Sequence, residues 1–284
     1  MEPIIRPKQK PDEKLSLMSF TFAVSATAIV YILTLMLLCP GLLARQFEKG
    51  LWPIVWVTLP FHFFLGGFEF FFHRYVLHSA VFRWLKEFYK NHTLHHALTS
   101  IFRKKTSPTS SDDGNLGKIV SHYEIKNEKQ YESSFFPYWG LAGFAGFFSL
   151  LTVPLQWLMP HTPILVGSFV AMTFSYCLYE LLHALEHVPY PSFWKKFVES
   201  PKFGTLGKKV YGFHAAHHAN VMCNMAISGV FGLPVFDWLF KTYKQPRTLL
   251  LDGTLATEED FSAPEPRRFI RWLDHRLVEK PKAA

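Results

Sequence analysis

Residues 163–187 read PILVGSFVAMTFSYCLYELLHALEH, an apolar run that ends in two histidines four positions apart. About twenty apolar residues suffice for a helix to cross the roughly 30 Å hydrocarbon core of a bilayer, so residues 163–182 predict a membrane span. Histidine is the commonest protein ligand for transition metals, and positions i and i+4 lie on one face of a helix. The stretch therefore places two candidate metal ligands at the end of a predicted membrane helix.

Three further apolar stretches, residues 15–38, 51–72 and 136–159, are long enough to span a bilayer. The first exceeds the apolar core of a signal peptide, which is about 7 to 15 residues long, so we expect it to be retained. Only Pro160–Thr162 separates the last two spans, which predicts a tight hairpin. The predicted fold class is an all-α integral membrane protein with four transmembrane helices.

The distribution of Lys and Arg predicts the orientation. Ten of these residues fall in 73–135 and fourteen follow residue 182, against two between the first two spans. Because cytosolic loops carry the excess of positive charge, residues 73–135 and 183–245 are expected to form a cytosolic helical cap on a single domain, 1–284. The net charge of +8 is attributed to this topology, and no nucleic-acid partner is expected. The charged tail, 264–284, is expected to lie outside the core.

Ten of the fourteen histidines gather in four clusters, each at or near the end of an apolar stretch. Histidines at i, i+3 and i+4 span about 100° of a helix, so an HxxHH motif offers three nitrogens on one face. Residues five apart lie about 140° apart on a regular helix, so the first pair either straddles a helix end or binds different metals. Ten ligands exceed the four of a closed zinc site and predict two ions with about five nitrogens each. The ten are His73, His78, His92, His95, His96, His183, His187, His214, His217 and His218.

These motifs resemble the histidine boxes of the fatty acid hydroxylase superfamily, a group of integral-membrane oxidases that includes fatty acid 2-hydroxylases and sterol desaturases. The matching stretches are HRYVLH, HTLHH, HALEH and HAAHH, which begin at residues 73, 92, 183 and 214. Residues 237–243, DWLFKTY, are similar to the D-x-x-F-G-T-Y ending of the family, with Lys241 in place of the glycine. The resemblance extends over roughly residues 60–245.

The resemblance implies that the ten histidines hold two iron ions, that O2 is a co-substrate and that a membrane lipid is oxidised. It also implies a separate electron donor of the cytochrome b5 or ferredoxin type with its reductase. An unactivated C–H bond needs a redox metal, which zinc is not, although zinc can occupy such ligands in isolated protein. Hydroxylation is preferred over desaturation. The alternative from another class is a membrane zinc-binding or transport protein.

Acidic residues near the clusters are candidates to orient the N–H groups of the ligands. Glu69 and Glu180 lie near the ends of apolar helices, where a carboxylate is expensive unless it is paired or faces a cavity. Tyr179 precedes Glu180 and completes an aromatic-acid pair similar to one in the family. Glu186 is a further candidate that fits a solvent-facing role equally well.

The expected compartment depends on the source. Lys280–Ala284 fits a K-x-K-x-x retrieval pattern of the endoplasmic reticulum, which is the expected membrane in a eukaryote. In a bacterium the cytoplasmic membrane takes its place. In both cases the active site is expected to face the cytosol.

Overall fold

The computed structural model describes residues 17–104, 117–121, 136–251 and 254–278. Four of its helices are long and apolar enough to cross a membrane, which confirms the predicted helical membrane fold. The chain ends and Lys280–Ala284 lie outside the described residues. The candidate spans are α1 (Leu17–Leu38), α3 (Trp52–Phe72) with its π-helical continuation η1 (His73–Leu77), α6 (Gly140–Leu158) and α7 (Ile164–Glu186).

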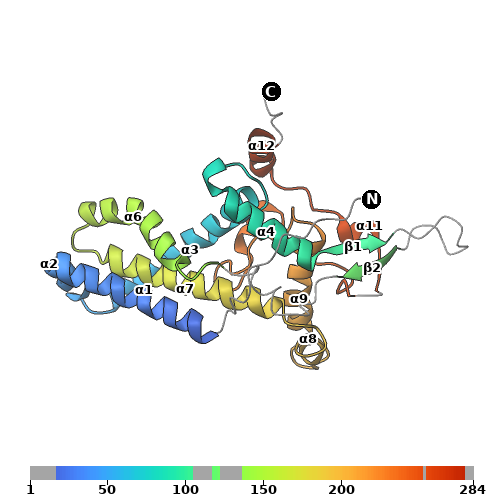
Figure 1. Ribbon diagram of the computed structural model, residues 1–284, viewed down its shortest axis with the longest axis horizontal. Helices are drawn as coiled ribbons and strands as arrows, with labels where there is room; N and C mark the ends of the chain where they lie inside the picture. Colours follow the sequence, from blue (N-terminus) through green and yellow to red (C-terminus); the bar gives the residue numbers. More distant parts are fainter. Residues whose placement is uncertain (1–16, 105–116, 122–135, 252–253, 279–284) are drawn as a thin grey trace, which may run out of the picture.

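Helices α3 and α7 form the centre of an elongated bundle, and α1 and α6 pack beside them (Figure 1). Gly167 of α7 allows this close approach, because a Cβ at that position would lie 2.6 Å from the Val57 side chain. The Thr58 hydroxyl adds an interhelical contact, donating to the Gly167 carbonyl at 3.1 Å. Helix α7 runs without a break to Glu186, so the span itself carries His183 out of the bundle.

The cap lies at one end of the bundle and is built from short helices and a small antiparallel sheet with strand order β1-β2-β3 (Figure 1). The sheet is an addition that the sequence did not predict. Ile101 of β1 is buried against Trp194 and Tyr211, which fixes the sheet to the helices that follow α7. The remaining elements are α2 (Pro40–Phe47), η2 (Arg83–Leu85), α4 (Lys86–Thr99), β1 (Ile101–Lys104), β2 (Gly117–Ser121), α8 (Trp194–Val198), α9 (Gly204–Ala219), α10 (Val235–Phe240), β3 (Leu255–Ala256), α11 (Glu258–Phe261) and α12 (Arg268–Leu277).

The charged tail was expected to lie outside the core. The structure corrects this, because α12 docks on the π-helix η1. Ile270 is fully buried. The Asp274 carboxylate accepts hydrogen bonds from Arg74 Nε at 2.9 Å and Nη2 at 2.6 Å, and from the Tyr75 hydroxyl at 2.8 Å. Arg74 therefore has its counter-ion 200 positions away, where sequence periodicity gives no signal.

Replacing Asp274 by Leu is expected to destabilise the protein by about 3–5 kcal/mol, because it leaves the buried Arg74 guanidinium uncompensated. The measurement is thermal unfolding in detergent. The control is Glu265→Gln, which breaks the exposed ion pair with Arg271 and is expected to cost no more than about 1 kcal/mol. Equal effects of the two substitutions would contradict a structural role for the buried pair.

Candidate metal centre

All ten predicted histidines converge at the junction between the bundle and the cap, in two groups of five. Within each group, one ring nitrogen from every member lies within 4.8 Å of the others. Each group can therefore hold a metal ion, and each offers five nitrogens, the number that the sequence predicted. Centre 1 comprises His73, His78, His92, His96 and His217; centre 2 comprises His95, His183, His187, His214 and His218.

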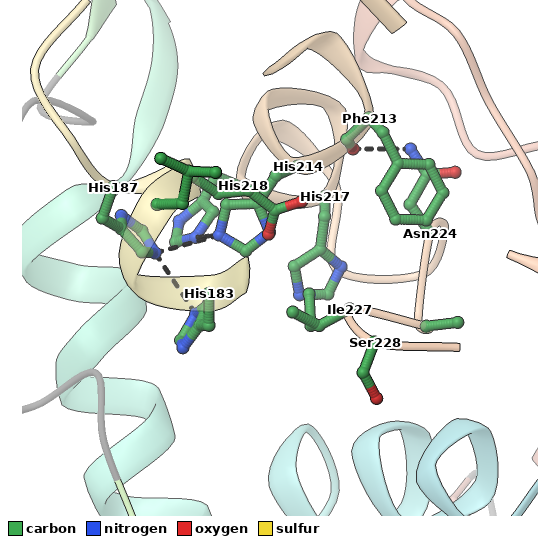
Figure 2. Close-up of polar contacts among 12 residues, drawn as sticks. His183, His187, Phe213, His214, His217, His218, Asn224, Ile227 and Ser228 are labelled. Carbon is green, nitrogen blue, oxygen red and sulfur yellow. Dashed lines mark hydrogen bonds and ion pairs between the residues drawn. The ribbon is translucent and has the colours of Figure 1, made fainter. Parts of the chain in front are cut away.

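The two HxxHH motifs are shared between the centres in a reciprocal way. Each motif gives its i, i+4 pair to one centre and its i+3 histidine to the other. The centres are neighbours, since the rings of His96 and His218 stack with centroids 4.2 Å apart. Figure 2 shows His214 and His218 turned toward His183 and His187, whereas His217 points toward the segment that carries Ile227. Helix α4 gives His92 and His96 to centre 1 and His95 to centre 2; α9 gives His217 to centre 1 and His214 and His218 to centre 2.

A π-helical turn brings His73 and His78 into the same centre. The His78 backbone N–H donates to the His73 carbonyl at 3.0 Å, which closes an i to i+5 turn. Residues five apart in such a turn lie nearly above one another, and the two rings stack with centroids 4.9 Å apart. The helix is therefore not regular at this point, and of the two alternatives the one that assigned His73 and His78 to different metals was wrong.

Backbone carbonyls fix the ring nitrogens that face centre 1. His73 Nδ1 lies 2.6 Å from the Met225 carbonyl oxygen, and His217 Nδ1 lies 2.8 Å from that of Cys223. A carbonyl only accepts, so both Nδ1 atoms carry the hydrogen and both Nε2 atoms present a lone pair. Those lone pairs point into a cluster of nitrogens, His73 Nε2 being 3.0 Å from His92 Nε2. A cation removes the repulsion among them.

The spacing of the ring nitrogens fits atoms that share one metal ion. Two nitrogens about 2.0–2.1 Å from one ion are about 2.8–3.0 Å apart at right angles and about 3.3–3.4 Å apart at the tetrahedral angle. The Nε2 atoms of His78 and His217 are 3.1 Å apart in centre 1. In centre 2, His214 Nε2 is 2.9 Å from that of His187 and 3.0 Å from that of His218. Across the two groups these Nε2–Nε2 distances run from 2.9 to 3.2 Å, between the two spacings, so they fit nitrogens that share one metal ion in either geometry.

The environment keeps these imidazoles in the neutral form that binds metal. Burial lowers the pKa of His217 to about 4. Burial, followed by the neighbouring imidazoles, lowers the pKa of His92, His95, His96 and His218 well below the ordinary value. At neutral pH each of these imidazoles therefore has one nitrogen without a proton, and a metal can bind there without displacing one.

Glu186 is the carboxylate that contacts a ligand. The residue is 3% exposed and its Oε2 lies 3.2 Å from His214 Nδ1. A carboxylate behind the imidazole fixes the tautomer and raises the basicity of the nitrogen that faces the metal. The sequence left Glu186 undecided between this position and solvent, and the structure places it inside.

Glu69 and Glu180 were expected to orient ligand N–H groups, but the hydrogen bonds they accept within the described part of the chain come from other groups. Glu69 accepts from the backbone N–H groups of Ile227 at 2.6 Å, Ser228 at 2.8 Å and Gly229 at 3.0 Å, and from the Ser228 hydroxyl. Glu180 accepts from the Phe136 N–H at 3.0 Å. Tyr179 lies next to a ligand, with its ring centroid 5.6 Å from that of His183.

Sequence reasoning missed three other partners of the ligands. Two are the carbonyls of Cys223 and Met225, which carry no side-chain signature. The third is Thr99, whose hydroxyl lies 2.7 Å from the His95 carbonyl oxygen and 3.1 Å from His218 Nδ1. Thr99 follows His95 by four residues in α4, so helical spacing was the signal that could have found it.

Replacing Glu186 by Leu is expected to weaken metal binding at centre 2 by about 10- to 100-fold, because His214 loses the carboxylate that orients it. Metal retained after dialysis against a chelator measures the effect, and one of two ions should be lost first. The control is Glu199→Gln, on an exposed residue of the cap. Unchanged retention in the Glu186 variant would contradict the assigned contact.

An apolar cavity lies beside centre 1, between α3, α6 and α7. Its wall includes His73, Glu69, Tyr179 and the aromatic side chains of Phe68 and Phe148. A second, wider apolar hollow adjoins it on the side of α12, where Leu273 and Leu277 contribute to the wall. The residues that line both are Phe68, Phe72, Phe136 and Phe144.

The fold and the site define a helical membrane protein with two adjacent five-histidine groups that can hold metal ions. Scans against protein-family models and searches of curated proteins and of solved structures found no match. The chemistry of the site is therefore the basis for the functional proposal.

Proposed function

We propose that this chain is an O2-dependent di-iron oxidoreductase of the fatty acid hydroxylase type that hydroxylates a C–H bond of a membrane lipid. The observation that supports the proposal is the pair of five-imidazole centres beside an apolar cavity whose wall contains the ligand His73. Iron bound at these centres supplies the redox chemistry with O2 that an unactivated C–H bond requires.

The residues of the chain perform the remaining tasks. The ten imidazoles hold the metals. Contacts to Met225, Cys223, Thr99 and Glu186 orient four of the rings, those of His73, His217, His218 and His214 respectively. The aromatic wall of the cavity suits an alkyl chain and excludes water from the bond to be oxidised. Among the described residues that line the cavity, Glu69 is the one carboxylate, and its oxygens already accept hydrogen bonds from Ile227–Gly229.

The adjoining hollow provides a route for the substrate. It shares four phenylalanines with the inner cavity and borders α3 and α6, two helices apolar enough to lie in lipid. A lipid chain in the bilayer is already desolvated, so entry from the side costs little hydration free energy. The cap is proposed to face the cytosol, where a separate donor delivers electrons.

The test uses protein reconstituted with iron, a reductase system, a total lipid extract and isotopically labelled O2, with products read by mass spectrometry. One labelled oxygen atom in a lipid product is the expected result. Loss of two hydrogens without oxygen would assign desaturation instead. The zinc-loaded protein is the matched control and is expected to give no product. Absence of both outcomes across several lipid classes would overturn the proposal.

A further inference from the structure

The chain between His218 and Asp237 is the feature that the function does not yet explain. Its eighteen residues, 219–236, carry no charge although they fall in the expected cytosolic cap. Residues 223–233 belong to no helix and to none of the three strands of the sheet. A long uncharged segment of irregular backbone is unusual on a cytosolic surface, where loops are polar.

This segment runs along helix α3 toward the centre of the span. The Met225 carbonyl contacts His73, the N–H groups of residues 227–229 donate to Glu69, and the Phe231 N–H donates to His62 Nε2 at 3.0 Å. From His73 to His62 is eleven residues, or about 16 Å along a helix that rises 1.5 Å per residue. That distance is about half of the hydrocarbon thickness, so the tip of the segment reaches mid-membrane depth.

Two ionisable side chains of α3 satisfy the backbone of the segment at this depth. Irregular backbone is tolerated inside a membrane only where its N–H and C=O groups find partners in the protein. Glu69 accepts three consecutive N–H groups, and His62, which is fully buried, accepts a fourth. Because Phe231 donates to Nε2, His62 carries its hydrogen on Nδ1 and donates to the Ser175 hydroxyl at 2.8 Å.

Glycines allow the segment to lie directly on α3. A Cβ at Gly66 would lie 3.0 Å from the Gly229 carbonyl oxygen, and one at Gly67 would lie 3.0 Å from the Phe236 ring. Gly229 itself has φ of +51°, and a Cβ there would overlap the Leu233 carbonyl oxygen. The Gly66-Gly67 pair in the span therefore accommodates this loop.

The outer side of the segment is apolar and exposed. Phe231 is 54% exposed and Leu233 is 52% exposed. Phe63 of α3 is 49% exposed and its ring packs against Phe236, so the exposed apolar surface of the span continues onto the segment. Continuity with a membrane span, the depth reached and the absence of charge all indicate the same partner, the acyl chains of the bilayer.

We propose that residues 223–236 form a re-entrant membrane segment whose tip, Phe231–Leu233, contacts the lipid hydrocarbon. At its other end the segment presents the Cys223 and Met225 carbonyls to His217 and His73. It thereby connects centre 1 to the bilayer. The proposal stands independently of the reaction that the centres perform.

Spin labels on Phe231→Cys and Leu233→Cys, introduced separately into protein with Cys39→Ser, test this placement in phosphatidylcholine vesicles. Collision with O2, which concentrates in lipid, and with a water-soluble nickel chelate is measured by power saturation. Both labels are expected to show high accessibility to O2 and low accessibility to nickel, like a label at Leu33→Cys in α1. The matched control is Leu255→Cys on β3, which is 56% exposed and is expected to show the reverse.

The two labelled positions keep the test decisive if one variant folds poorly, which metal content reports. Signal from the buried native Cys223 and from Cys177 is measured in Cys39→Ser protein without the added cysteine. Nickel accessibility at Phe231→Cys or Leu233→Cys equal to that at Leu255→Cys would overturn the proposal. Failure to detect lipid oxidation would leave this result unaffected, so the two proposals are tested separately.

Discussion

Replacing His217 by Ala is expected to remove about one of two metal ions per chain and to lower product formation by at least 100-fold. Changes in residues that merely orient a ligand typically cost about 10- to 100-fold in metal affinity or activity, so loss of a ligand exceeds that range. His217 belongs to centre 1 and the next residue, His218, to centre 2. His218→Ala should therefore remove the other ion.

Metal content by mass spectrometry and turnover of the iron-loaded protein provide the two measurements. The double variant at His217 and His218 is expected to retain neither ion. His161→Ala is the matched control, because His161 is exposed in the turn between α6 and α7 and outside both groups. Full metal content and turnover in His217→Ala would contradict its assignment as a ligand. Inactive wild-type protein that binds two ions would instead contradict the proposed reaction alone.

The spans could be predicted because their signal is local. A run of about twenty apolar residues has few alternatives to a membrane helix, and the structure places all four candidate spans within a few residues of the predicted stretches. Helix α7 extends four residues beyond its predicted end at Leu182, because the LLHALE sequence continues to favour helix beyond the apolar region. The small sheet was not predictable, since two-residue β3 pairs with β2 from a distant part of the chain.

The candidate ligands could also be recognised from short stretches of sequence. Their division between the two centres could not. The spacing within HTLHH and HAAHH predicts nitrogens on one side of each helix. Which nitrogens share an ion depends on how α4 and α9 face each other, and on the π-helical turn that aligns His73 with His78. Neither property is encoded in the spacing.

For the acidic residues too, the sequence shows that a position is unusual but does not show which groups bind the carboxylate. A carboxylate in an apolar helix indicates a constraint, and Glu69 is partly buried and hydrogen-bonded, as its position suggests. Its partners are backbone N–H groups about 160 positions away, which no side-chain pattern reveals. Glu186 was harder to assign because it follows the apolar part of α7. An acidic residue beyond the end of a span can equally well face solvent.

Replacing Gly229 by Ala is expected to release metal from centre 1 while centre 2 keeps its ion. The added Cβ would overlap the Leu233 carbonyl oxygen at a backbone φ of +51°, so the segment must move. Movement of the segment displaces the Met225 and Cys223 carbonyls, which orient the centre 1 ligands His73 and His217. The expected loss of affinity at centre 1 is about 10- to 100-fold.

Centre 2 should be spared because its ligands are held from other elements. His218 is held by Thr99 of α4 and His214 by Glu186 of α7. Gly232→Ala is the matched control, since Gly232 also has a positive φ but a Cβ there meets only the Leu182 side chain at 3.8 Å. Iron content after dialysis against graded chelator should fall to about one ion per chain in the Gly229 variant and remain at two in the control. Glu69→Leu, which removes the acceptor of three N–H groups of the same segment, should reproduce the loss. Equal loss from both centres would show that the segment supports the whole junction and not centre 1 in particular.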